Sequence, residues 1–207
     1  MTDFYIFRHG QTEWNRERRL QGLADNPVND TGLQQAKELA NLLRGTGVSL
    51  LAASPLKRAQ QTVAVIAEAL DLPIITDNRL REVDLGEADG MTFEAFREKF
   101  GEDRALRFIT STEAMDLEFA LPSGEKKGSA LNRALEALSD ISQKTDSQCI
   151  GICCHGLIMR LLMRHSGCKD SYPMANGDLV HLVLNENKLC FAQYLPNKVK
   201  TRGIFGN

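Results

Sequence analysis

Two histidines of this sequence stand in the same local setting. Arg8-His9-Gly10 follows the apolar run at residues 4–7, and His155-Gly156 follows the apolar run at 149–154. A glycine beside each histidine removes a side chain where the backbone would have to approach a ligand closely. For one such histidine, a hydrogen-bonded residue at a strand end is the favoured interpretation. Two of the four histidines in this setting indicate a site.

A third position adds positive charge. Ser54 and Pro55 predict a helix start, with Ser54 as N-cap and the proline at the first helical position, which places Arg58 in the first turn. A cation there opposes the helix dipole, so an anion nearby would offset it. For Arg58 alone, a side chain that extends into solvent, as that of Lys57 would, is an equal alternative.

Two guanidinium groups and two imidazoles together suit a dianionic phosphoryl group. The forked donors of arginine match phosphate oxygens in pairs, and a helix N-terminus adds backbone N–H donors. These cations can meet the charge that Mg²⁺ would otherwise neutralise, so we expect neither a metal nor a cofactor. The three cysteines at 149, 153 and 154 match no common zinc spacing and are predicted to be buried strand thiols.

The elements that must position these residues alternate along the chain. Apolar runs and helical spacing predict strands at 3–8, 49–53, 73–76, 148–154, 179–184 and 188–195, and helices at 29–44, 54–70, 93–100, 132–144 and 156–166. This alternation is typical of a three-layer α/β/α sandwich around a mostly parallel sheet, and the final hairpin adds an antiparallel edge. Ligands of such sheets bind beyond the carboxyl ends of the strands, where both histidines are expected.

The middle of the chain carries a less regular pattern. We expect residues 1–207 to form a single domain, with a cap inserted at about 87–128 over the site. The last ten residues are polar and basic and are predicted to be loosely held.

The bulk composition limits the classes of partner. The 207 residues are 43% hydrophobic and 25% charged, with a formal net charge of -2. No global basic field is available for nucleic acid or a membrane surface, and no apolar run reaches the roughly 20 residues of a membrane helix. We read no signal peptide, so a cytoplasmic location and a small phosphorylated metabolite as partner are expected. The oligomeric state stays open, a homodimer included.

A signature and five motifs that follow it in order carry a resemblance to a known family. Residues 8–15 (RHGQTEWN) match the signature R-H-G-x-T-x-x-N in full. The segments Gln21-Gly22, 29–36 (NDTGLQQA), 54–62 (SPLKRAQQT), 80–90 (LREVDLGEADG) and His155-Gly156 follow in the expected order. The chain thus resembles the histidine phosphatase superfamily, the phosphoglycerate-mutase-like proteins, over about residues 3–194.

The resemblance implies a role for each matching residue. His9 would be the nucleophile that accepts the phosphoryl group, and Glu82 the proton donor to the leaving oxygen and then the base for water. The phosphoryl oxygens would be bound by Arg8, Asn15, Arg58, His155 and Gly156. Thr12, Gln21 and Gly22 would contact the substrate.

Elementary chemistry agrees with these residue types. A neutral imidazole is a competent nucleophile when its other nitrogen is fixed, and an alkoxide leaving group needs a carboxyl held near neutral pKa. Burial against neighbouring apolar residues would raise the pKa of Glu82, while the arginines would lower it. Asp84 is the rival acid, and a salt bridge from Glu82 to Arg79 or Arg81 is the structural alternative.

Three places in the chain depart from the family pattern or extend it. Gly124-Glu125-Lys126 stands where the family often has Gly-Glu-Ser, so a substrate contact there is in doubt. Cys154 replaces a frequent hydroxyl residue before His155. Arg18 and Arg19 could reach a second anionic group, although a solvated run of charges is the favoured interpretation.

The sequence therefore predicts a metal-independent phosphatase that hydrolyses a phosphomonoester through phosphohistidine. A cofactor-dependent phosphoglycerate mutase is the first alternative, ranked lower because such mutases usually have a longer chain around the cap than 207 residues provide. A non-catalytic phospho-ligand binding protein is the second.

Overall fold

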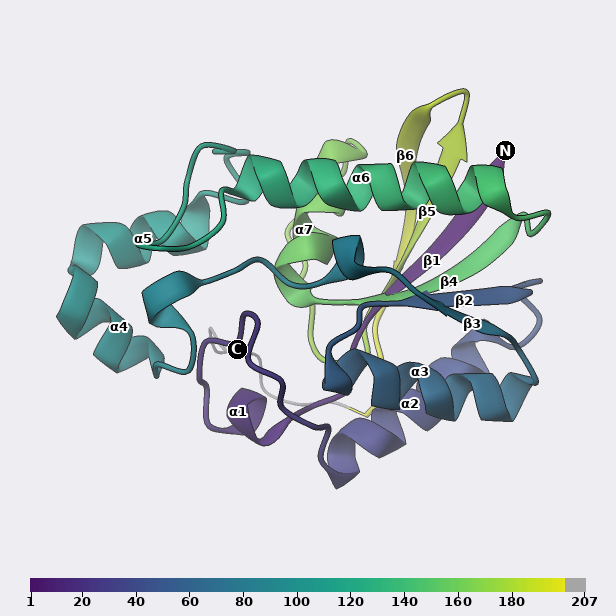
Figure 1. Ribbon diagram of the computed structural model, residues 1–207, viewed down its shortest axis with the longest axis horizontal. Helices are drawn as coiled ribbons and strands as arrows, with labels where there is room; N and C mark the ends of the chain where they lie inside the picture. The colour runs from purple at the N-terminus through teal and green to yellow at the C-terminus, as the bar shows by residue number, and fades with distance from the viewer. Residues whose placement is uncertain (200–207) are drawn as a thin grey trace.

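A six-stranded mixed sheet forms the centre of the computed structural model, which describes residues 1–199 (Figure 1). Its strands are β1 (Thr2–Arg8), β2 (Leu50–Ala53), β3 (Ile74–Thr76), β4 (Cys149–Cys154), β5 (Leu179–Asn185) and β6 (Lys188–Leu195), in the order β3-β2-β4-β1-β5-β6. Strands β3, β2, β4 and β1 are parallel, while β5 and β6 pair antiparallel at one edge. The predicted α/β class and antiparallel edge are confirmed.

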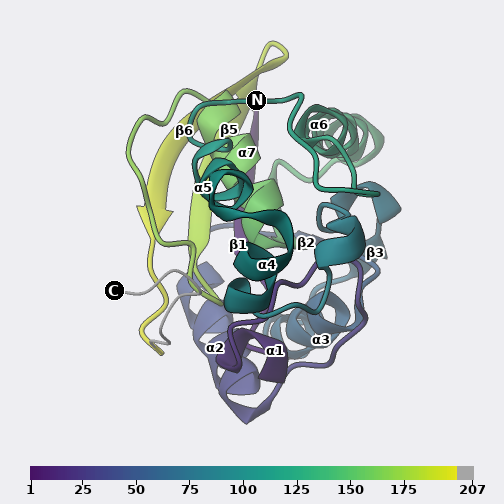
Figure 2. The same cartoon turned by 90° about the vertical axis from the view of Figure 1, so that its left-hand side faces the viewer.

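Helices cover both faces of this sheet. Helices α2 (Asp30–Leu43) and α3 (Lys57–Leu70) lie on one face, and α6 (Lys127–Lys144) and α7 (Gly156–His165) lie on the other (Figures 1 and 2). Strand β1 serves both cores because alternate side chains point to opposite faces. Phe7 packs with the α2–α3 core, whereas Phe4 and Ile6 pack in the α6–α7 core.

Two helices and two short turns fill the segment between β3 and α6. They are η1 (Asn78–Leu80), η2 (Gly86–Ala88), α4 (Phe93–Phe100) and α5 (Glu102–Thr110). Helices α4 and α5 project beyond the end of the sheet toward which β1 runs (Figure 1). Phe96 of α4 packs against Phe108 of α5, with their ring centroids 5.6 Å apart. The sequence predicted α4 with its observed bounds but not α5, which buries only Ala105 and Phe108. That residues 87–128 act as a cap stays a prediction.

Two helices begin elsewhere than predicted. Ser54 is not an N-cap: α3 begins at Lys57, whose N–H donates to Asp25 Oδ1 at 2.6 Å, so Arg58 is the second helical residue. Helix α6 begins at Lys127 rather than 132, because the N–H groups of Lys127 and Gly128 donate to carbonyls of the preceding loop. In both cases the partner that caps the helix is distant in sequence or lies in an irregular loop.

The last described residues, up to Val199, are hydrogen-bonded to the rest of the structure. Asn197 is buried and its Oδ1 accepts from Val199 N–H at 2.9 Å, while Gln35 Nε2 donates to the Val199 carbonyl. The sequence predicted that residues 198–207 are loosely held. The hydrogen bonds of Val199 contradict this prediction at that residue, and residues 200–207 lie outside the described part of the chain. Among the described helices, none combines the length and the apolar character needed to cross a membrane.

Candidate active site

Strand pairing brings the two histidines together. Strands β1 and β4 are parallel neighbours, and Arg8 is in register with Cys154, so His9 and His155 leave the sheet side by side. Their ring centroids are 5.2 Å apart and both residues are buried. Both histidines therefore lie together at the carboxyl ends of their strands, as predicted.

The hydrogen bonds of His9 define its tautomer. Its Nδ1 lies 2.8 Å from the Gly10 carbonyl, which can only accept, so Nδ1 carries the proton. Nε2 then holds a lone pair, toward which Arg58 Nε donates at 3.2 Å. Burial, followed by the charges of Arg58 and Arg8, lowers the pKa of His9 well below its usual value. His9 is thus a neutral imidazole with an available nucleophilic nitrogen.

Arg58 is held rigidly beside that nitrogen. The residue is fully buried, and its Nη1 and Nη2 donate to the carbonyls of Ala24 and Gly22, both at 2.7 Å. The Asp89 carboxylate accepts from the N–H groups of the same two residues and so fixes the loop. Burial lowers the pKa of Arg58 to about 10, which leaves it cationic at neutral pH. The Gly22 carbonyl orients Arg58, and a substrate contact of Gly22 stays a prediction. Asp89 was not predicted because its partners are backbone groups far away in sequence.

Arg8 and Gly156 form the opposite side of the site. Arg8 Nη1 donates to the Met174 carbonyl at 2.7 Å, while its buried Nε has no partner among the described residues. A Cβ at position 156 would lie 3.4 Å from that Nε, so the guanidinium packs directly against the start of α7. Burial lowers the pKa of Arg8 to about 10, so Arg8 also keeps its charge at neutral pH.

His155 has one nitrogen engaged and one free. Its Nε2 is hydrogen-bonded to Ser54 Oγ at 2.8 Å, and its buried Nδ1 has no partner among the described residues. Burial, with Arg58 next in importance, lowers the pKa of His155 well below its usual value. If Ser54 donates to Nε2, the neutral ring presents Nδ1–H as a donor. The sequence did not indicate Ser54 as a site residue, because Ser54-Pro55 was interpreted as the start of a helix.

The loop after β1 supplies a further unpaired donor. Thr12 is the N-cap of the four-residue helix α1 (Glu13–Arg16), and Asn15 completes a capping box with it. Asn15 Oδ1 accepts from Thr12 N–H and from Asn176 Nδ2. Its buried Nδ2 has no partner among the described residues and Asn15 lines the cleft described below. Thr12 is fully buried and bonds to Gln21; Gln21 lines the cleft, whereas Thr12 supports it from behind.

Glu82 is the buried carboxyl of the site. It is 5% exposed, and it accepts from Val83 N–H at 2.9 Å and from Leu157 N–H at 3.1 Å, at the N-terminus of α7. Burial raises its pKa, although these N–H groups and the charges of Arg58 and Arg8 lower it in part. A buried carboxyl with a raised pKa can hold a proton for transfer.

Two alternatives to Glu82 as the acid were a salt bridge from Glu82 to Arg79 or Arg81, and Asp84 as the acid instead. Arg79 pairs with Asp77 and Asp140, and Arg81 pairs with Glu125, so neither is the partner of Glu82. Asp84, the rival acid, accepts from Gly86 N–H at 2.8 Å and does not line the cleft.

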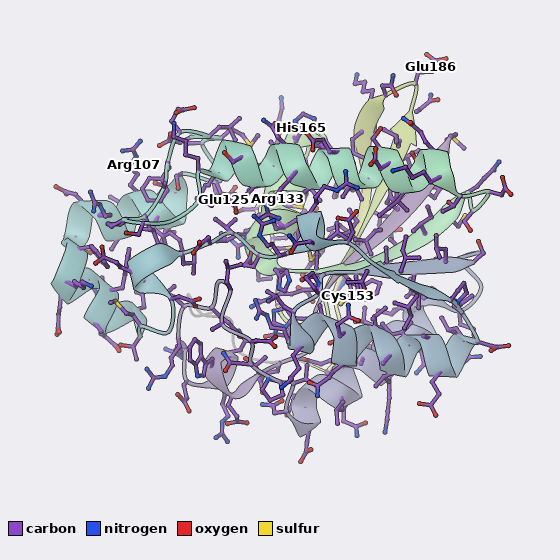
Figure 3. The ribbon with its side chains drawn as sticks, in the orientation of Figure 1. Arg107, Glu125, Arg133, Cys153, His165 and Glu186 are labelled. Carbon is purple, nitrogen blue, oxygen red and sulfur yellow. The ribbon has the colours of Figure 1, made fainter. Side chains whose placement is uncertain are left out.

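Glu125 has a supporting position. Figure 3 shows Glu125 and Arg133 pointing toward one another from the loop before α6 and from α6 itself, with Arg133 Nη2 and Glu125 Oε2 2.8 Å apart. Arg133 also donates to the carbonyls of Arg79, Arg81 and Glu82, and so fixes the backbone that carries the acid. Glu125 therefore orients Glu82 through Arg133, without lining the cleft itself.

The other departures lie outside the cleft. Cys154 is a fully buried thiol whose pKa is raised by burial. Arg18 is exposed, and Arg19 bonds to Glu17 and to the Gly90 carbonyl, so neither lines the cleft.

A cleft of about 1020 Å³ opens over these groups, and its base is formed by Arg8, His9, Asn15, Gln21, Glu82 and Gly156. Unpaired nitrogen donors, a neutral imidazole and a protonatable carboxyl lie together there. Such a set can bind a phosphoryl group, attack it and protonate its leaving oxygen. Within residues 1–199, no three His, Cys, Asp or Glu side chains are grouped so as to hold a metal ion.

Known proteins resemble this chain in both sequence and fold. A probable phosphoglycerate mutase GpmB from Enterobacter sp. (strain 638) is 35% identical over 164 residues, which is 79% of this chain and 74% of that protein. The structure of Bacillus stearothermophilus YhfR matches with a TM-score of 0.81 and 26% identity, covering 99% and 100% of the two chains. A mycobacterial glucosyl-3-phosphoglycerate phosphatase matches with a TM-score of 0.79 at 23% identity, over 93% and 98%, and so shares the fold.

The family model described as histidine phosphatase superfamily (branch 1) matches residues 4–191. This match runs from within β1 to the middle of β6 and includes His9, His155, Arg58 and Glu82. The chain belongs to the histidine phosphatase superfamily, branch 1, and has its phosphoglycerate-mutase-like fold.

Proposed function

We propose that this chain is a metal-independent phosphatase that hydrolyses a small phosphorylated metabolite through phosphohistidine on His9. The observation that carries the proposal is a group of three buried nitrogens at the site, Arg8 Nε, Asn15 Nδ2 and His155 Nδ1, which have no partner within residues 1–199. Buried donors are rarely left unpaired, so an absent acceptor is expected among them. Phosphoryl oxygens next to the Nε2 lone pair of His9 would satisfy all three.

The first step forms one bond and breaks one. His9 Nε2 attacks phosphorus, the bond from phosphorus to the ester oxygen breaks, and Glu82 gives its proton to the departing alkoxide. Arg8 and Arg58 compensate the charge that moves onto the phosphoryl oxygens. The hydrogen bond from Arg58 Nε to His9 Nε2 must give way to one with a phosphoryl oxygen.

The second step reverses these roles for water. The Glu82 carboxylate removes a proton from a water molecule, which attacks phosphorus as the bond to His9 Nε2 breaks. Phosphate leaves, His9 returns to its neutral form and Glu82 is again protonated. Three backbone N–H groups around Glu82 stabilise the carboxylate between the two steps.

A mutase remains the alternative that the GpmB-named relatives favour. Phosphoglycerates carry a carboxylate beside the reacting phosphate, and a bisphosphorylated cofactor adds a second phosphate. Among the described residues that line the cleft, Arg160 is the one cation beyond Arg8. So little positive charge away from the phosphoryl site supports hydrolysis over return of the group to a phosphoglycerate.

The test is phosphate release from benzyl phosphate in EDTA, with isomerisation of 3-phosphoglycerate measured in parallel under 2,3-bisphosphoglycerate. We expect hydrolysis that EDTA does not reduce, and loss of turnover in His9→Ala with an unchanged circular dichroism spectrum. Isomerisation without hydrolysis would assign a mutase. Full activity of His9→Ala would end the proposal, and phosphate binding with neither activity would point to a binding protein.

A further inference from the structure

We infer that the cleft selects phosphomonoesters whose alcohol carries a bulky apolar or aromatic group; this inference rests on the proposed hydrolysis. Its basis is the part of the cleft that the reaction does not use. About 1020 Å³ is at the upper end of pockets that enclose drug-sized ligands, far more than a phosphoryl group needs. The remaining space must belong to the leaving group.

One wall of that space is apolar and comes from the segment between β3 and α6. Phe108 and Ile109 of α5 line it, and Leu20 and Leu85 continue the surface toward the phosphoryl site. Ile109 is 38% exposed, one of the few large apolar side chains in the described chain that remain so accessible. A leaving group that covers Ile109 would remove this apolar surface from water.

Aromatic residues form the opposite wall. The rings of Tyr172 and Tyr194 stack with centroids 4.2 Å apart, and both residues line the cleft together with Met174. Tyr194 donates its hydroxyl to Asp178, and Tyr172 donates to Asp170. The hydroxyls are therefore engaged within the protein, which leaves ring surface as the chemistry offered to a ligand.

Polar residues that line both walls of the cleft are largely engaged within the protein as well. Glu113 is ion-paired with Arg164, and the Asp178 carboxylate accepts from Ala175 and Asn197 N–H groups. Thr112 Oγ1 accepts from Lys127, and Arg160 donates to the Pro173 carbonyl. A sugar moiety, whose every hydroxyl needs a partner once water is excluded, would find few here, whereas one acceptor could still use the spare donors of Arg160.

Two esters with similar leaving-group chemistry test the inference. Benzyl phosphate and glycerol 3-phosphate are both primary alkyl esters, so a difference in kcat/KM reports binding of the alcohol portion rather than its departure. We expect benzyl phosphate to be preferred at least tenfold, chiefly through KM. Because no hydrolysis is needed to observe binding, calorimetry should likewise show benzylphosphonate binding at least tenfold more tightly than methylphosphonate.

Helix α5 offers a matched pair of variants. Ile109 lines the cleft, while Leu106 lies on the same helix, is 58% exposed and does not line it. Ile109→Asp should reduce the benzyl-to-glycerol preference about tenfold by placing a charge against the apolar group, and Leu106→Asp should leave it unchanged. Ile109→Ala, which adds no charge, should reduce the preference severalfold and covers the case that the aspartate disturbs α5.

The outcomes separate the two claims. Hydrolysis with equal or better use of glycerol 3-phosphate, or equal effects of the Ile109 and Leu106 variants, would overturn the selectivity and leave the phosphatase standing. No hydrolysis, together with tighter binding of benzylphosphonate that Ile109→Asp weakens, would overturn the phosphatase and retain the selectivity of the cleft. No preference between the two phosphonates would overturn the selectivity directly.

Discussion

At the scale of single residues, opposing physical effects determine whether His9 and Glu82 each carry a proton. His9 is kept neutral by burial and two arginines, and the Gly10 carbonyl selects the tautomer with a free Nε2. Glu82 receives three backbone N–H groups, which favour its carboxylate, yet burial outweighs them and raises its pKa. The proposed nucleophile His9 and the proposed acid Glu82 thus have their pKa values shifted in opposite directions within one cleft.

These opposite shifts predict how rate depends on pH. Protonated Glu82 is needed for the first step, so kcat/KM for benzyl phosphate should fall as pH rises through the raised pKa of Glu82. It should also fall as pH drops through the lowered pKa of His9, where the imidazole gains a proton. In Glu82→Gln the alkaline fall that Glu82 causes should vanish, and kcat/KM should drop about a hundredfold or more.

Leaving-group chemistry provides the control for this prediction. The phenolate of p-nitrophenyl phosphate departs without a proton, so Glu82→Gln should slow its kcat/KM by less than about tenfold. Asp84→Asn should change neither substrate's rate much, because Asp84 is bonded to Gly86 N–H outside the cleft. A larger loss in Asp84→Asn than in Glu82→Gln would make Asp84 the acid.

At the scale of elements, the strand ends could be predicted because their signals are local. The apolar runs before His9 and His155 end where β1 and β4 end, and glycine follows each histidine. The features that could not be predicted depend on hydrogen bonds between residues far apart in sequence. Asp25 caps α3 in place of Ser54, and Asp89 holds the loop that orients Arg58. Such contacts join segments whose separation in sequence gives no periodic pattern.

Helix α5 and the start of α6 were missed for a related reason: they stabilise each other. Lys127 Nζ is buried 2.5 Å from both Ser111 Oγ and Thr112 Oγ1, and it lies over the rings of Phe108 and Phe119. The cation opposes the dipole at the start of α6, and no salt bridge joins it to a described carboxylate. A lysine at a helix start reads as a solvent-exposed residue in the sequence, whereas here it ties α6 to the end of α5.

Lys127 should leave a signature in the stability of the fold. Burial lowers its pKa from 10.5 to about 8, so between these values the unfolded chain binds a proton that the folded chain does not. Stability from this group therefore rises with pH. The unfolding free energy of the wild type minus that of Lys127→Met should increase from pH 7 to 10, by up to about 3 kcal/mol, in urea titrations. The neighbouring exposed Lys126, as Lys126→Met, should show no such rise; a flat or falling difference for Lys127→Met would contradict the burial of a charged group.

At the scale of the whole molecule, the fold concentrates positive charge in one place on a nearly neutral chain. The net charge is only -2, yet Arg8 and Arg58 meet at the carboxyl edge of the sheet, under a cleft bounded by α5 and the segment after α7. Helices cover both faces of the sheet beside that edge, while α5, the segment after α7 and β6 supply the apolar lining of the cleft. Under the proposed function, the sheet edge would bind the phosphoryl group, and the elements beyond it would bind the alcohol portion.

The most direct test of this account is to trap the phosphohistidine. Glu82→Gln should still be phosphorylated by p-nitrophenyl phosphate, whose phenolate needs no acid, but should be slow to lose the group because water has no base. Rapid mixing in EDTA, alkaline quenching and peptide mass spectrometry should give a stoichiometric burst of p-nitrophenolate and a phosphoryl adduct on His9. Steady turnover without a burst or adduct, or an adduct on His155 instead, would contradict the account.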